Sequence, residues 1–167
     1  MTTDVKVQFF SHLNGLNLGN NWGDLIRLLD AVLVNGVSLP SITAASIDEQ
    51  GDVHLSFYAD HKALLFQVVE LAGFAPELLN QKYRIKGVPS ATSLILKPET
   101  ALSETVISSS GNAKLASLGY EIIFRDANDV KRVYRAQNPS AQHPFIRVDE
   151  TLSNLEGSYT ETYAKYA

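Results

Sequence analysis

Four histidines, His12, His54, His61 and His143, are the residues of this sequence best suited to metal or proton-transfer chemistry. No two of them have the spacing that places a pair of imidazoles on one helix face. His54 and His61 could ligate a metal together with Asp60, but no pattern in the sequence orients these three side chains. We therefore expect hydrogen-bonded or exposed histidines and no metal site.

Nucleophilic chemistry and paired carboxylates have as little support in the sequence. The chain contains no cysteine, and it lacks the Gly-x-Ser-x-Gly elbow that would expose a serine nucleophile. The acidic pairs Asp48-Glu49 and Asp149-Glu150 are adjacent residues, and adjacent side chains of a strand point to opposite faces of a sheet. The sequence thus predicts a protein that has no catalytic residues and is not an enzyme.

Glycines precede the most helix-like segment, where a phosphate group could bind in principle. Gly15, Gly19 and Gly23 are spaced by four residues, but the Gly-Lys-Ser/Thr that ends a phosphate loop is absent. Asp24 follows these glycines directly and would repel an anion at the start of the helix. We expect a structural role for the glycines and no bound cofactor.

Composition narrows the classes of partner that the chain can bind. Its 167 residues carry a formal net charge of −4, and 45% of them are hydrophobic, which indicates a folded rather than a disordered chain. The dense basic stretch at 131–135 lies beside acidic residues, which argues against direct binding of nucleic acid. No window approaches the ~20 apolar residues of a membrane-spanning helix. Residues 1–10 lack the pattern of a signal peptide.

The strongest secondary-structure signal predicts an amphipathic helix from Asp24 to Val34. Asn20 or Asn21 can cap its first turn, because an Asn side chain accepts hydrogen bonds from unpaired N–H groups. Apolar residues recur at helical spacing, namely Leu25, Ile26, Leu28, Leu29, Val32 and Leu33. Gly36 is the type of residue favoured just past a helix end. The apolar face would pack inside the subunit or against a neighbouring subunit, and we favour the inside.

The rest of the chain predicts short strands separated by turns. Alternation of Val5, Val7 and Phe9 with polar residues is typical of a half-buried strand. Several short strands follow at close spacing between Ile42 and Leu96, which favours a small barrel or sandwich. The expected fold class is α+β, mostly β. One N-terminal amphipathic helix would pack on an antiparallel sheet, with a small β-barrel or sandwich module inserted.

Changes in composition predict three regions along the chain. Residues 1–40 and 113–167 would form a helix-and-sheet assembly domain, and residues 41–98 the small β-barrel module. Residues 99–112 are rich in Ser and Thr and are predicted to be a linker. The tail from residue 153 is polar with scattered tyrosines, so it either frays or docks on a neighbour.

Three stretches resemble, in the same order, a group of structural proteins of tailed-bacteriophage virions. Residues 18–36, LGNNWGDLIRLLDAVLVNG, resemble an opening of the form Gly, small residue, Leu-Ile-x-Leu-Leu-Asp-Ala-x-Leu-Val-Asn-Gly. Residues 51–85, with GDV, QVV, LAGFAP and LNQKYRI, are similar to a small β-barrel module whose usual form contains His-Gly-Leu and Asn-Gly-x-Tyr-x-Val. Residues 118–151, with LGYE, VYRA and FIRVDET, are similar to the close of the same group. Lys62 and Gln81 each stand where that module usually has Gly, so the turns there can differ.

The resemblance implies a non-enzymatic virion component of the tail, neck or baseplate, made in the cytoplasm of the host bacterium. It implies other virion structural proteins as partners and copies of the chain itself in a ring or trimer. An alternative is a module that decorates the capsid or recognises a glycan on the host surface. Exposed aromatic side chains would favour that alternative, and Tyr58, Phe74 and Tyr83 are the candidates in the barrel region.

Five residues are candidates for subunit contacts: Trp22, Arg147, Asp149, Tyr159 and Tyr163. Trp22 precedes the helix and either packs on its first turn, which we favour, or anchors a contact, where tryptophan is over-represented. Arg147 and Asp149 alternate with Ile146 and Val148 and are expected on the sheet face opposite the packed one.

Overall fold

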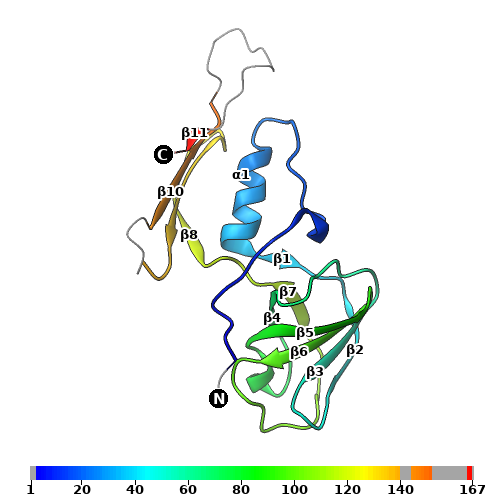
Figure 1. Cartoon of the computed structure of the whole chain (residues 1–167). Coiled ribbons are helices and arrows are strands. Elements are labelled where there is room, and N and C mark those ends of the chain that lie inside the picture. The colour runs from blue at the N-terminus through cyan, green and yellow to red at the C-terminus, as the bar shows by residue number, and fades with distance from the viewer. Residues whose placement is uncertain (1–2, 140–143, 152–164, 167) are drawn as a thin grey trace. The chain divides into compact units, whose positions relative to one another are not determined.

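The computed structural model describes residues 3–139, 144–151 and 165–166, the last two by their backbone alone. The chain divides into two compact units (Figure 1). Unit 1 comprises residues 1–16 and 36–116, and unit 2 comprises residues 17–35 and 117–167. The described elements confirm the expected class, α+β and mostly β, with one short helix and curled antiparallel sheet.

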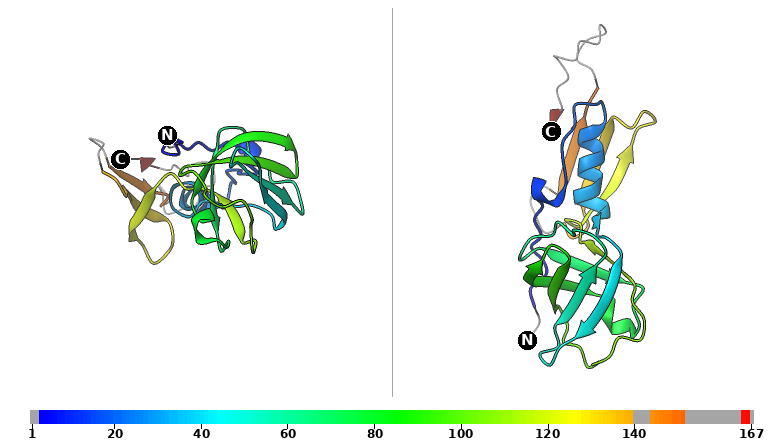
Figure 2. Two further views of the ribbon diagram at one scale, coloured as in Figure 1. Left: turned by 90° about the horizontal axis from the view of Figure 1, so that it is seen from below. Right: turned by 90° about the vertical axis from the view of Figure 1, so that its right-hand side faces the viewer.

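Unit 1 is built on a seven-stranded antiparallel sheet that curls into a half-barrel (Figure 2). Its strand order is β1-β7-β4-β5-β6-β3-β2. The strands are β1 (Val37–Ser38), β2 (Ile42–Ile47), β3 (Val53–Phe57), β4 (Val68–Ala72), β5 (Lys82–Ser90), β6 (Ser93–Pro98) and β7 (Asn112–Leu115). Two short 3-10 helices, η1 (His12–Asn14) and η3 (Glu77–Leu79), complete the unit.

The core of unit 1 follows from strict alternation of apolar residues along its strands. In β3, Val53, Leu55 and Phe57 are buried, whereas the side chains between them are only partly covered. Two-residue periodicity puts all three on the inner face of the curl. Tyr83 from β5 is fully buried, and its hydroxyl donates to the Leu79 carbonyl oxygen at 2.7 Å, which satisfies its polar end.

Unit 2 consists of a helical segment and a four-stranded antiparallel sheet of order β11-β10-β9-β8. The strands are β8 (Tyr120–Arg125), β9 (Lys131–Ala136), β10 (Phe145–Asp149) and β11 (Lys165–Tyr166). The helical segment is α1 (Asp24–Leu29), continued as a π-helix by η2 (Asp30–Asn35). The predicted helix is therefore confirmed, but its second half is wound more loosely than an α-helix. Gly36 follows at a φ of 74°, as expected past a helix end.

The apolar face of the helix packs inside unit 2, as favoured from the sequence. Leu25, Ile26 and Leu33 form one buried cluster with Tyr134 of β9 and Val148 of β10. A helix covering one face of an antiparallel sheet leaves the other face of that sheet open.

Two local predictions were wrong. Asn20 and Asn21 do not cap the helix with their side chains, because Gly23 occupies the cap position in the left-handed region, at a φ of 87°. Residues 5–9 belong to no strand. They run as an extended segment in which Val5 is buried and Val7 and Phe9 are exposed. Alternation identified an extended conformation here, but it could not reveal that no neighbouring strand pairs with it.

The boundaries of the units differ from the expected regions. Residues 3–16 belong to unit 1 rather than with the helix, and β7 pairs with β1 and β4 in the unit 1 sheet. Residues 99–112 also belong to unit 1, where Leu102 and Ile107 pack against the core. These long-range pairings have no signature in local composition.

Candidate assembly surfaces

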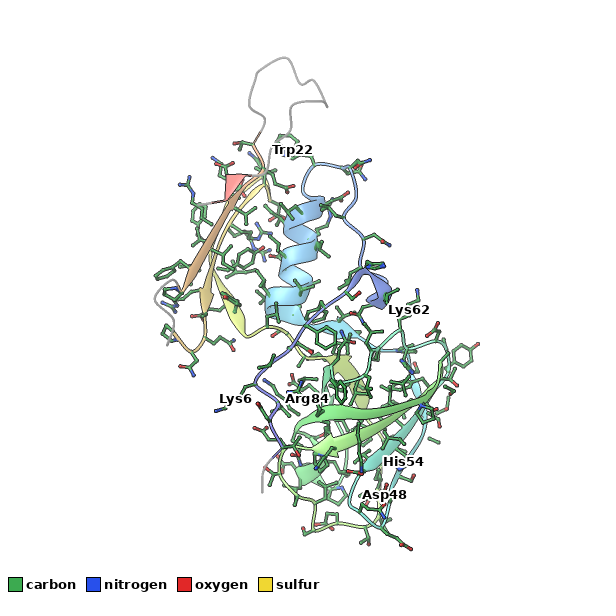
Figure 3. All side chains as sticks on the ribbon, viewed as in Figure 1. Lys6, Trp22, Asp48, His54, Lys62 and Arg84 are labelled. Atoms are coloured by element: carbon green, nitrogen blue, oxygen red, sulfur yellow. The ribbon has the colours of Figure 1, made fainter. Side chains whose placement is uncertain are left out.

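Two of the four histidines, His54 and His61, make structural hydrogen bonds in unit 1, whereas His143 lies outside the described residues. His61 is buried, its Nδ1 accepts from the Ala63 N–H at 2.9 Å, and its Nε2 lies 3.0 Å from the Ser90 carbonyl oxygen. His54 Nε2 lies 2.8 Å from Asp48 Oδ2 at one end of β2 and β3 (Figure 3). This bond holds the pKa of Asp48 below its usual value. Within the described ranges, no group of three His, Asp or Glu side chains could hold a metal ion.

A buried charged network lies between the helix and the sheet of unit 2. The guanidinium of Arg132 donates to Asp129 at 2.8 Å and to Asp30 at 3.3 Å. Asp30, from the π-helical turn, also accepts from the Tyr134 hydroxyl at 2.7 Å. Burial, together with this hydrogen bond, raises the pKa of Tyr134 far above its usual value. The network joins the helix to the sheet, and within it Arg132 Nε is buried without a hydrogen-bond partner among the described residues.

Glu150, just past β10, lies near the start of the helix. Burial raises its pKa, and the N–H groups of Ile26 and Leu25 act in the opposite direction. Its Oε2 is buried and has no hydrogen-bond partner among the described residues. The Trp22 indole N–H donates to the Glu150 carbonyl oxygen at 2.6 Å. Trp22 is thus anchored inside unit 2 while half of its surface, 50%, stays exposed.

The sheet face opposite the helix, here called the outer face, combines aromatic and charged side chains. The strand register aligns its side chains in three rows, Phe124–Val133–Arg147, Glu121–Arg135–Phe145 and Lys131–Asp149. Phe124 and Phe145 are exposed over 51% and 55% of their surface. Aromatic and arginine side chains side by side are characteristic of protein–protein interfaces.

Arg147 and Asp149 lie on this outer face, since Val148 between them is buried against the helix. Arg147 Nη2 is 3.9 Å from Asp149 Oδ2, and Lys131 Nζ is at the same distance from that oxygen. Hydrogen bonds from the Thr151 hydroxyl and N–H hold the pKa of Asp149 below its usual value. A subunit contact through these two residues stays a prediction. Tyr159 and Tyr163 lie outside the described residues.

A second candidate surface is formed in unit 1 by residues 3–14, here called the strap. The strap is extended without strand pairing up to η1, which forms its last three residues, and the Gln8 side chain holds it in place of a strand ladder. Gln8 Nε2 donates to the carbonyl oxygens of Val68 and Ala116, both at 2.8 Å, while Gln8 Oε1 accepts from the Val68 N–H at 2.8 Å. One amide thus satisfies three main-chain groups at the end of β4 and β7.

A buried amide pair holds the far end of the strap. Asn14 and Gln67 exchange two hydrogen bonds, of 2.9 and 2.8 Å, between their side chains. Gln67, which is fully buried, also donates to the Phe9 carbonyl oxygen at 2.9 Å and accepts from the Leu64 N–H at 2.7 Å. Asn14 donates in addition to the Lys62 carbonyl oxygen at 2.8 Å. The Gln67 amide thus donates two hydrogen bonds and accepts two.

Arg84 of β5 binds the N-terminal end of the strap (Figure 3). Its Nη1 donates to the carbonyl oxygens of Val7 and Phe66, both at 2.7 Å, and its Nη2 donates to the Asp4 carbonyl oxygen at 2.6 Å. Every acceptor is a main-chain oxygen, so the five-donor fork of arginine recognises the backbone of the strap rather than its side chains.

No signal in the sequence pointed to this arrangement. Gln8, Asn14, Gln67 and Arg84 are isolated polar residues, and their roles depend on contacts between distant parts of the chain. The runs QVV and LNQKYRI of the barrel resemblance contain two of them, Gln67 and Arg84, but the resemblance implied no role for either.

No protein-family model, curated protein or solved structure matches this chain. Among the described residues, no helix has the length and the apolar character that crossing a bilayer would require.

Proposed function

We propose that this chain is a non-enzymatic structural subunit of a tailed-phage virion, in the tail, neck or baseplate, acting through protein–protein contacts in a symmetric assembly. The virion assignment is supported by the sequence resemblance in three ordered stretches. The assembly role is supported by the outer face of unit 2, where Phe124 and Phe145 are exposed among charged side chains. Copies of the chain and other virion proteins are the proposed partners.

The outer face suits assembly because its charges can pair across a contact while its phenyl rings lose water. Aromatic anchors surrounded by polar groups provide most of the binding free energy at protein interfaces. In a closed ring, each subunit repeats the same contact, so a modest affinity per contact is sufficient.

A charge exchange on the outer face tests this role. Arg147→Glu combined with Asp149→Arg preserves net charge but reverses the local field. We expect the oligomer seen by gel filtration and negative-stain microscopy to dissociate while the circular dichroism stays unchanged. The matched control is Lys97→Glu with Glu99→Lys, which has the same spacing and signs in unit 1 and should assemble normally. If the wild-type chain is monomeric at all concentrations and in phage lysates, the proposed function is wrong.

One observation favours the alternative, a capsid-decorating or glycan-recognising module. Of the three aromatic candidates in the barrel region, Phe74 and Tyr83 are buried, but Tyr58 is 83% exposed. A monomer that is retained on host envelope, and released by Tyr58→Ala, would favour recognition over assembly. Retention that survives Tyr58→Ala would leave this alternative without its structural support.

A further inference from the structure

We propose that the strap of one copy docks in the groove of a neighbouring copy, so that exchange of straps links subunits in the assembly. The groove, here called the strap groove, is formed by Gln67, Val68, Arg84 and Ala116 of unit 1. This inference rests on the proposed function, because it names the contact by which copies of the chain would be joined.

The strap groove recognises the backbone of an extended segment. Arg84 donates hydrogen bonds to the carbonyl oxygens of Asp4 and Val7, and Gln67 donates one to that of Phe9. In the structure the groove already holds residues 3–14 of this chain, so shape and hydrogen bonding fit that segment. The strap of a second copy is chemically identical and would form the same bonds.

The strap is attached mainly by hydrogen bonds and little by apolar burial. Within the described residues, Val5 is its only buried apolar side chain, in a small cluster with Val68 and Ala116 apart from the main core, and Phe10 packs partly buried against the main core. Withdrawal of the strap would uncover the part of the main core that Phe10 covers. It would also leave the Gln67 amide buried without its partners, which is costly. The groove is thus expected to be filled at all times, either by its own strap or by a neighbour's.

The connection that exchange must alter is suited to a change of path. Residues 17–21, before the anchored Trp22, are in no helix or strand and are exposed. Gly15 and Gly23 flank them, both with positive φ, at 81° and 87°, where glycine is unstrained. Exchange keeps every bond between strap and groove and changes only this connection, which is the condition under which swapping is inexpensive.

Charge does not oppose a second copy at this surface. The strap contributes Asp4 and Lys6, and the groove contributes Arg84, whose hydrogen bonds to the strap all go to neutral carbonyl oxygens. The exposed side chains of Val7 and Phe9, at 67% and 41%, would remain available to a further neighbour in either arrangement.

Disulfide trapping tests the exchange directly, because the chain has no cysteine of its own. Val5→Cys and Val68→Cys place one thiol on the strap and one in the groove, at residues that pack together. The two single variants are mixed, assembled and oxidised. We expect a covalent heterodimer of the two variants on a non-reducing gel, at least ten-fold above that from Val5→Cys mixed with Val88→Cys, an exposed control on β5. The double variant Val5→Cys/Val68→Cys checks, in one chain, that the two thiols can bond.

A second variant keeps the proposal testable if oxidation is inefficient. Arg84→Met removes the grip on the strap and should shift the oligomer toward monomer at least ten-fold, whereas Lys82→Met on the same strand should not. An oligomer that gives no heterodimer above the control, or that survives Arg84→Met unchanged, overturns strap exchange and leaves the proposed function standing. A chain that never forms an oligomer overturns both.

Discussion

Units 1 and 2 are both antiparallel sheets, but they stabilise their interiors in different ways. Unit 1 buries a cluster of fourteen apolar residues inside its curl, and its polar side chains hold the strap at the margin. Among its described residues, unit 2 buries a cluster of five and adds a charged network of Asp30, Arg132 and Tyr134 between helix and sheet. A large apolar interior tolerates many substitutions. The stability of a small interior with a buried ion pair depends on both partners of that pair.

The difference shows which residues determine the packing of each unit. In unit 1 the period of two along the strands is enough to define the inside. In unit 2 the helix could slide on an all-apolar sheet, but the Asp30 carboxylate must meet both the guanidinium and the phenol. We interpret the network as the feature that fixes the helix at one register.

The largest effect is expected from Asp30→Ala in unit 2. It leaves the Arg132 guanidinium underpaired and the Tyr134 hydroxyl without its acceptor, so the unfolding free energy should fall by about 3–5 kcal/mol. Urea unfolding followed by the fluorescence of Trp22, the only tryptophan and a residue of unit 2, measures it. Glu121→Ala, which breaks the exposed pair with Arg135, is the control and should cost below about 1 kcal/mol. Equal losses would contradict the role of the network.

A core truncation in unit 1 tests whether the two interiors are independent. Leu96→Ala removes a fully buried side chain and should cost about 2–5 kcal/mol, seen in the circular dichroism of urea unfolding. Because Trp22 lies in unit 2, the urea midpoint of the unfolding transition seen by its fluorescence should stay unchanged. A shift of both signals by the same amount would show one cooperative structure and refute the comparison of separate cores.

These differences explain how far the sequence could predict the fold. The short strands expected between Ile42 and Leu96 are found in that region as β2 to β6, because the pattern that predicts a strand is a local property. The helix was found by its apolar stripe. The expected asparagine cap was wrong, because Gly23 occupies the cap position.

The candidate surfaces were predicted less completely, for the same reason. Arg147 was placed on the outer face by alternation with Val148, but its neighbours Phe124 and Phe145 depend on strand pairing. The β-bulge between Ile122 and Phe124 further changes which residues of β8 face outward. Residues 5–9 of the strap were predicted as a strand, since the sequence cannot show that Gln8 replaces the main-chain ladder.

Adjacent carboxylates of unit 2 should respond to pH with opposite sign. Burial raises the pKa of Glu150, so the folded state holds its proton more firmly. Its contribution to stability is fully present below its ordinary pKa of 4.5 and is lost as pH rises through the raised value. Asp149 has a lowered pKa, so its contribution is present above 3.8 and is lost as pH falls through the lowered value.

Urea unfolding between pH 3 and pH 8 measures both contributions. The free energy of unfolding of Glu150→Gln should rise relative to that of the wild type as pH rises above 4.5. Asp149→Asn should be less stable than the wild type at neutral pH, and this difference should disappear as pH falls below 3.8. Parallel curves for the wild type and Glu150→Gln across the range would show that burial of this carboxylate has no effect on stability.

The smallest expected effect concerns the backbone at Lys62, where the barrel module that the sequence resembles usually has Gly. Lys62 has a φ of 51°, in the left-handed region, which costs a residue with a side chain about 1–2 kcal/mol. Glycine removes that strain but loses about 0.5–1 kcal/mol in chain entropy. Lys62→Gly should therefore stabilise unit 1 by about 0.5–1 kcal/mol, measured by circular dichroism in urea. Lys82→Gly, at an exposed strand position with ordinary φ, should destabilise it. If both glycines destabilise equally, Lys62 carries no strain, and the departure from the resembled pattern costs this unit nothing.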